Sequence, residues 1–114
     1  MVSSINSSAQ ALKAFGTATA VTANNVANVA SDNFKSSRAV MNEGSDGGVK
    51  VSLSMNSSQG PLVTQSNGAT KELSNTDLAT EITSMINYQS GYGANIKSIQ
   101  AADEMKGTII NMMA

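Results

Sequence analysis

The sequence predicts a mainly α-helical protein whose long N- and C-terminal helices pair as an antiparallel coiled coil, with a small β-hairpin or loop between them. Three observations predict this fold. Apolar or small residues recur at spacings of four and three in both terminal segments, and a short middle segment alternates with a period of two. The 114 residues fit one domain. We divide it into an N-terminal helix (1–33), a hairpin or loop region (34–73) and a C-terminal helix (74–114), which together form one helical stalk.

The first helix is expected over about residues 4–30. Apolar and small residues at heptad spacing form a stripe along this helix, which we call its seam. Small residues on the seam, such as Gly16, would let a partner helix approach closely. Asp32 and Asn33 follow the helix and suit a turn, because Asn tolerates the left-handed conformation that ends helices. The N-terminal seam consists of Ile5, Ala9, Leu12, Gly16, Thr19, Ala23 and Val26.

The second helix is expected over about residues 75–113, with Ser74 or Asn75 as its N-cap and Asp77 in its first turn. Gly91 and Gly93 each cost about 1 kcal/mol relative to Ala inside a helix, so they mark either a close helix contact or a flexible joint. The C-terminal seam consists of Leu78, Ile82, Met85, Gln89, Tyr92, Ile96 and Ile99, and it continues through Ala102, Met105, Ile109 and Met112.

The middle of the chain has a different composition. Residues 43–48 form a Gly-rich turn cluster, and residues 49–55 alternate between apolar and polar side chains as a half-buried strand does. A second turn at 56–61 precedes residues 62–65, which could form a returning strand. We therefore expect one small hairpin or loop between the helices.

Composition excludes several classes of function. The chain has no His and no Cys, so imidazole and thiolate metal sites and disulfides are excluded. A net charge of −1 argues against binding nucleic acid mainly through phosphates. Asp103 and Glu104 are adjacent on the expected helix and point about 100° apart, which does not suit shared acid–base chemistry. We expect no catalytic residues, no cofactor and no small-molecule substrate.

The same composition predicts a thin core. Ser, Thr and Asn make up 38 residues, whereas Phe and Tyr together number four. Two weakly apolar helices cannot enclose a core, and isolated helices of this kind are marginally stable in water. We therefore expect both helices to keep apolar surface for neighbouring chains.

The N-terminus lacks the charged and apolar regions of a secretory signal, and no apolar run approaches the roughly 18 residues that a membrane span requires. A protein exported without a cleaved signal fits these features, as does one that stays in the cytoplasm.

Two motifs carry a family resemblance. The segment ANNVANVASDNFK (23–35) places three Asn residues in five positions, which weakens a helix and suggests amides that serve contacts outside the chain. It resembles the N-terminal motif of the bacterial flagellar axial proteins of the rod and hook, roughly N-N-x-A-N-x-x-T-x-G-Y/F-K. The stretch from SNTDLATE to ADEM, within residues 74–112, resembles the C-terminal motif of the same family. Together the two segments cover 52 of the 114 residues.

The resemblance implies a short rod-type axial subunit located in the flagellar basal body. It implies export in an unfolded state through the flagellar type III apparatus, and assembly with copies of itself and with neighbouring axial proteins. Asn33 stands where the family has Gly, and Ser90 replaces an Arg. The short middle excludes a hook or distal rod protein with a large inserted domain, although the C-terminal motif is closer to those members. The motif positions that we expect at contacts between subunits are Asn24, Asn25, Asn28, Phe34, Lys35, Asn75, Asp77, Glu81, Gln89 and Asn95.

An alternative is a secreted helical-hairpin protein, such as a needle-type subunit or an export cargo that binds one partner. This class shares the length and the lack of a signal, but it gives no reason for the paired motifs. A defined 1:1 complex in place of filaments would favour it.

Overall fold

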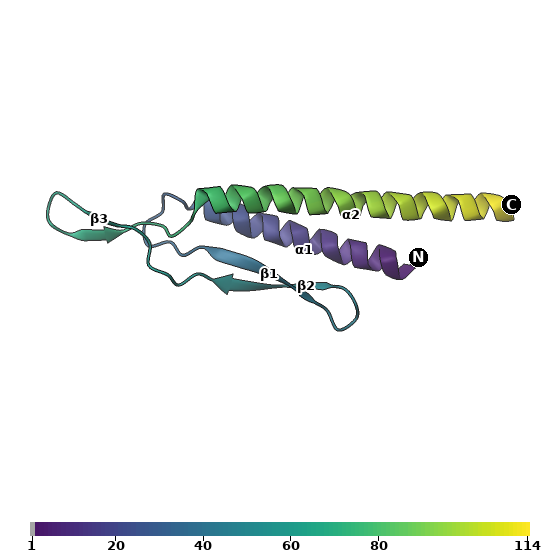
Figure 1. Cartoon of the computed structure of the whole chain (residues 1–114), viewed down its shortest axis with the longest axis horizontal. Coiled ribbons are helices and arrows are strands. Elements are labelled where there is room, and N and C mark those ends of the chain that lie inside the picture. The colour runs from purple at the N-terminus through teal and green to yellow at the C-terminus, as the bar shows by residue number, and fades with distance from the viewer. Residues whose placement is uncertain (1) are drawn as a thin grey trace.

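The computed structural model describes residues 2–114 and contains two long helices with antiparallel β structure between them (Figure 1). The elements are α1 (Val2–Ala27), β1 (Ser37–Glu43), β2 (Val49–Met55), β3 (Leu62–Thr64), β4 (Thr70–Glu72) and α2 (Leu78–Met113). The molecule is elongated, with extents of 80 × 25 × 14 Å. Both termini lie at the same end, and the helices run antiparallel, as expected (Figure 1). Among the described residues, neither helix is long and apolar enough to cross a membrane.

Helix α1 is the central layer of the molecule. It contacts α2 on one side and both strands of the β1–β2 hairpin on the other (Figure 1). Its buried residues are small or polar: Ala14, Ala18, Thr22 and Asn25. Small side chains let both neighbouring layers approach the helix closely. After α1, Asn33 adopts a φ of 57°, which confirms the turn expected there.

Helix α2 begins later than expected because its N-cap is Asp77, not Ser74 or Asn75. The Asp77 side chain accepts hydrogen bonds from the backbone N–H groups of Ala79 (3.1 Å) and Thr80 (3.3 Å). The side chains of Ser74 and Asn75 are used elsewhere, Ser74 with Thr76 and Asn75 across the chain. Asp77 also supplies the negative charge that favours a helix N-terminus.

The β region contains two separate two-stranded antiparallel sheets, so the expectation of a single hairpin is wrong. Strand β2 pairs with β1, from Ser37 opposite Met55 to Glu43 opposite Val49. The 62–65 segment does not return along β2. Its residues 62–64 form β3 and pair with β4 through a turn in which Gly68 has a φ of 84°. The turn at 56–61 therefore links two hairpins.

The two hairpins have different environments. The β1–β2 hairpin lies along α1, whereas β3–β4 projects from the end of the molecule opposite the termini (Figure 1). The only fully apolar residues that are buried in the described chain are Ala14, Ala18 and Ala102. This thin core agrees with the composition and leaves many large apolar side chains exposed.

Candidate assembly interface

A polar junction joins the β-rich segments to the helices, and Asn25 lies at its centre. The Asn25 side chain is 1% exposed. Its Nδ2 donates to the backbone carbonyl of Ser37 at 2.7 Å, and its Oδ1 accepts from the Ser37 N–H at 3.0 Å. The amide thus pairs with β1 as a neighbouring strand would. Asn25 lies in a helix despite its low helix propensity because this pair of hydrogen bonds attaches β1 to α1.

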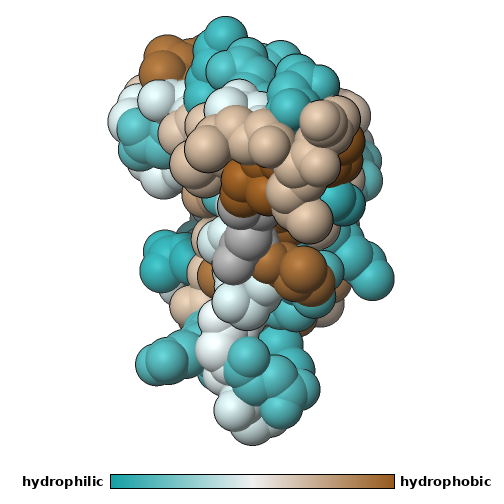
Figure 2. Space-filling model, turned by 90° about the vertical axis from the view of Figure 1, so that its right-hand side faces the viewer, coloured by the Kyte–Doolittle hydropathy of each residue, from teal (hydrophilic) through white to brown (hydrophobic). Residues whose placement is uncertain are grey.

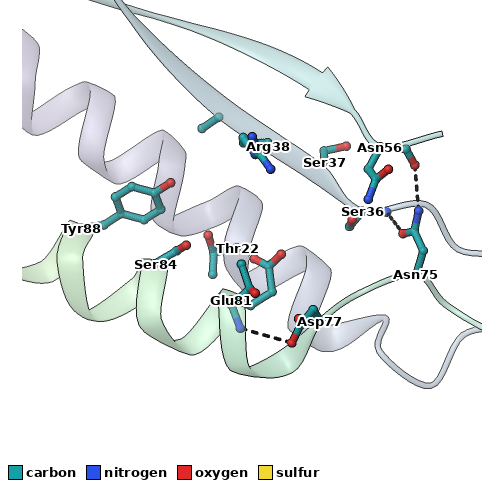
Figure 3. A pocket seen from close by; sticks show the side chains of 12 residues that line it. Thr22, Ser36, Ser37, Arg38, Asn56, Asn75, Asp77, Glu81, Ser84 and Tyr88 are labelled. Carbon is teal, nitrogen blue, oxygen red and sulfur yellow. Dashed lines mark hydrogen bonds between the residues drawn. The ribbon is translucent and has the colours of Figure 1, made fainter. Parts of the chain in front are cut away.

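Asn75 provides the second link of the junction. Its Oδ1 accepts from the Ser36 N–H at 2.7 Å, and its Nδ2 donates to the carbonyls of Asn56 (2.8 Å) and Ser58 (2.9 Å). Its backbone N–H also donates to the carbonyl of Phe34. One side chain therefore connects three segments that are far apart in the sequence, as Figure 3 shows for Ser36 and Asn56.

An ion pair completes the junction. The Lys35 ammonium contacts the Glu72 carboxylate and donates to the Ser58 carbonyl at 2.9 Å. The Gly60 N–H donates to the same Glu72 oxygen at 2.8 Å. The hydrogen bond from Lys35 lowers the pKa of Glu72 below its usual value of 4.5, and the Gly60 N–H lowers it further. Lys71 and Asp32 form a second ion pair nearby, at 2.7 Å.

A polar pocket of about 230 Å³ opens between the start of β1 and the first turns of α2 (Figure 3). Arg38, Asp77, Glu81 and Tyr88 are among its lining residues. The pocket therefore presents both signs of charge. The described residues contain no group of three or more His, Cys, Asp or Glu side chains placed to hold a metal ion.

The contact between the two helices is built around Phe15. Its ring centroid lies 6.3 Å from that of Tyr88, with the rings tilted by 46°. A Cβ atom at Gly91 would lie only 2.5 Å from the Phe15 ring, so Gly91 marks a close helix contact. At Gly93 and Gly16 a Cβ atom would meet nothing within 4 Å. Of the two alternatives for the α2 glycines, close contact therefore holds for Gly91 alone.

The seam residues lie mostly beside this contact, and not in its centre. Gly16 and Thr19 of α1 line a shallow groove with Gln89 and Tyr92 of α2, so the two seams meet along that edge. The half-buried seam residues that were predicted are Ile5, Leu12, Val26, Met85 and Ile99. The exposed ones are Ala9, Gly16, Ala23, Leu78, Ile82, Tyr92, Ile96, Met105 and Ile109.

Several motif residues make local contacts. Asn28 donates through Nδ2 to the Asn24 carbonyl at 2.9 Å and accepts from the Ser31 hydroxyl at 3.0 Å, which closes the end of α1. Asn95 donates to the Gly91 carbonyl one turn before it. Asn24 and Gln89 are exposed, and Phe34 and Glu81 are half-buried. The structure therefore brings Asn25, Lys35 and Asn75 together at the junction, near Asp77, whereas Asn24, Gln89 and Asn95 lie apart from it.

Sequence reasoning missed Glu72 and Tyr88, and it did not single out Phe15 as the centre of the helix contact. Glu72 lies inside the predicted hairpin or loop region (34–73) and carries no local signal. Phe15 precedes Gly16 on the predicted seam, and Tyr88 precedes Gln89. Both aromatic residues are thus one position away from the seam, and their size was a signal that could have shifted the predicted contact face.

A run of exposed apolar residues lies on α2 beyond its contact with α1. Ala102 is the last buried residue, and after it Met105, Ile109 and Met112 are 54%, 46% and 82% exposed. We call residues 105–113 the α2 tail. Viewed from the end where both termini lie, brown hydrophobic side chains stand among teal hydrophilic ones (Figure 2).

The architecture defines an elongated two-helix protein with a polar junction and an open apolar helix face. Residues 67–112 match the family model described as flagellar basal body rod FlgEFG protein C-terminal. The C-terminal part of the chain is thus similar to the flagellar rod family, which confirms the resemblance that the C-terminal motif predicted. The Asn-rich motif lies outside the matched residues, so its part of the resemblance stays a prediction. No curated protein matches the chain.

Proposed function

We propose that this protein is a structural, non-enzymatic subunit of the flagellar basal-body rod that polymerises through its terminal helices into the axial tube. The exposed apolar stripe of α2, inside the segment that matches the rod family, is the observation that carries the proposal. An exposed apolar helix face of this length is typical of a surface that binds another chain.

Pairing of the two predicted seams, followed by burial of the remaining apolar faces against neighbouring subunits, is the mode of assembly that we propose. The partners are other copies of the chain, neighbouring axial proteins and, during export, the flagellar type III apparatus. Export of an unfolded chain without a cleaved signal fits the thin core, since little packing would have to be undone. Asn24, exposed on α1, is a candidate for hydrogen bonds between subunits.

The test combines mass spectrometry of purified hook–basal bodies from the source strain with a swimming assay of the deletion mutant. We expect the chain in the particle, and we expect its loss to stop rod completion and swimming. Absence from the particle together with normal swimming would reject the proposal and favour a secreted helical hairpin with a single partner.

A second test uses the purified monomer. We expect protease-sensitive termini and a gain of helix by circular dichroism on assembly, because the helices are marginal without neighbours. A monomer that is already fully helical at micromolar concentration, with termini that resist protease, would count against assembly-coupled ordering.

A further inference from the structure

The α2 tail continues the face by which α2 packs on α1. Ala102 is buried, and Ile109 lies seven residues later, two turns further along nearly the same face. Met105 and Ile109 share an open apolar depression with Ala101, Glu104 and Thr108. The stripe is thus an established interface extended past the end of its partner helix, and a helix resembling α1 is the surface that suits it.

An α1 helix in a second copy offers one open side. Its own α2 covers one side, and the β1–β2 hairpin covers another. Between α1 and β2 runs a groove of about 420 Å³, lined by Lys13, Ala14 and Thr17 of α1 and by Val49, Lys50 and Val51 of β2. Gln10 closes one end of the groove by packing against Gly48.

The groove and the tail match in length. From residue 10 to residue 17 the α1 wall rises about 11 Å, and the stripe from Met105 to Met112 rises the same distance at 1.5 Å per residue. The groove has a buried small residue, Ala14, and the valines of β2 against which large tail side chains can pack.

Charge complements the apolar match. Lys13 and Lys50 stand on opposite walls of the groove, and Glu104 lies in the tail depression. Within residues 2–114 the ion pairs are Lys35–Glu72 and Lys71–Asp32, so these three groups have no ion partner inside the described chain. A carboxylate entering the groove would be placed between two free ammonium groups.

We infer that the α2 tail of one copy docks in the α1–β2 groove of the next copy, with Met105 and Ile109 against Thr17 and Val51, and Glu104 between the two lysines. The two surfaces differ, so the contact is heterologous and propagates from copy to copy in an open filament. This inference rests on the proposed function and names the surface through which it works.

Charge reversal tests the contact. Glu104→Lys should raise the critical concentration for assembly about three- to ten-fold, and adding Lys50→Glu to Glu104→Lys should restore much of the loss. Asp103→Lys is the matched control, because it makes the same charge change about 100° around the helix. If Asp103→Lys raised the critical concentration equally, or if the double variant restored nothing, the placement of Glu104 between Lys13 and Lys50 would be wrong.

Cysteine pairing tests the geometry directly, since the natural chain contains no Cys. Val51→Cys and Ile109→Cys chains, mixed at high concentration and oxidised, should form a disulfide-linked dimer. Val40→Cys, on the outer face of the hairpin, should form none with Ile109→Cys. Filaments that give no Val51–Ile109 crosslink would overturn the groove inference and leave the proposed function standing. Failure to assemble at any concentration would contradict both.

Discussion

The polar junction and the α2 tail differ in how their side chains are used within the chain. At the junction, Asn25 and Asn75 satisfy backbone groups of distant segments. In the tail, Met105 and Ile109 face solvent on a regular helix. Side-chain amides thus order the junction within the chain, whereas the apolar side chains of the tail stay exposed and, on the proposed function, are covered by other chains.

The largest expected effect on stability comes from removing the Asn25 side-chain amide. Asn25→Ala should lower the free energy of unfolding by about 2–3 kcal/mol, because the Ser37 N–H and carbonyl lose their partners near a buried site. Urea denaturation measures the change. Asn24→Ala, at an exposed neighbouring position, should stay within about 0.5 kcal/mol of the natural chain. Equal losses of unfolding free energy in the two variants would show that Asn25 is not the main link of the junction.

The helix contact should respond with opposite signs at two nearby glycines. Gly91→Ala should destabilise by about 1–2 kcal/mol, because its Cβ would overlap the Phe15 ring and outweigh the gain in helix propensity. Gly93→Ala should stabilise by about 0.5–1 kcal/mol, since its Cβ meets open space. Thermal unfolding of both variants measures the difference. Stabilisation by both substitutions would show that Gly91 does not lie against the Phe15 ring.

The Lys35–Glu72 pair should make the junction sensitive to acid. The pKa of Glu72 is lowered in the folded chain, so its contribution is present above the usual value of 4.5 and is lost as the pH falls through the lowered pKa. The effect is smaller than those above, because both side chains are about a quarter exposed. Unfolding free energies measured from pH 6 to pH 2.5 should fall more steeply for the natural chain than for Glu72→Gln. If the two proteins lost stability in parallel as the pH falls, the Lys35–Glu72 pair would not be the source of the acid sensitivity.

The smallest effect on the monomer should come from the tail. Ile109→Ser removes an exposed side chain from a position without partners in the chain, so the unfolding free energy of the monomer should change by less than about 0.5 kcal/mol. The same variant should assemble poorly, as sedimentation would show. A large loss of monomer stability would mean that the tail is already covered within one chain.

Local patterns in the sequence were enough to predict the helices and turns. The heptad spacing predicted both helices, and Asn33 was expected to tolerate the positive φ that it adopts. Strand β1 was missed because its side chains do not alternate clearly between apolar and polar types, and because its pairing depends on a turn that also suits a plain loop. The N-cap was misplaced because Asn75, a good capping residue, is held by Ser36 and Asn56 instead.

The site was harder to predict than the helices. The amides of the Asn-rich segment were expected to serve contacts outside the chain, yet Asn25 bonds to Ser37, 12 residues away in the sequence. Only the path of the folded chain decides which amide is buried and which is free. The apolar stripe of α2 was predictable because helical spacing alone places Met105, Ile109 and Met112 along one side.

Hydrogen exchange followed by mass spectrometry, on monomer and assembled protein, tests the contrast between junction and tail most directly. We expect protected amides around Ser36 and Ser37 in both states, and amides of the α2 tail that become protected only on assembly. Tail amides that are already protected in the monomer, or that exchange equally fast in the assembled protein, would contradict it.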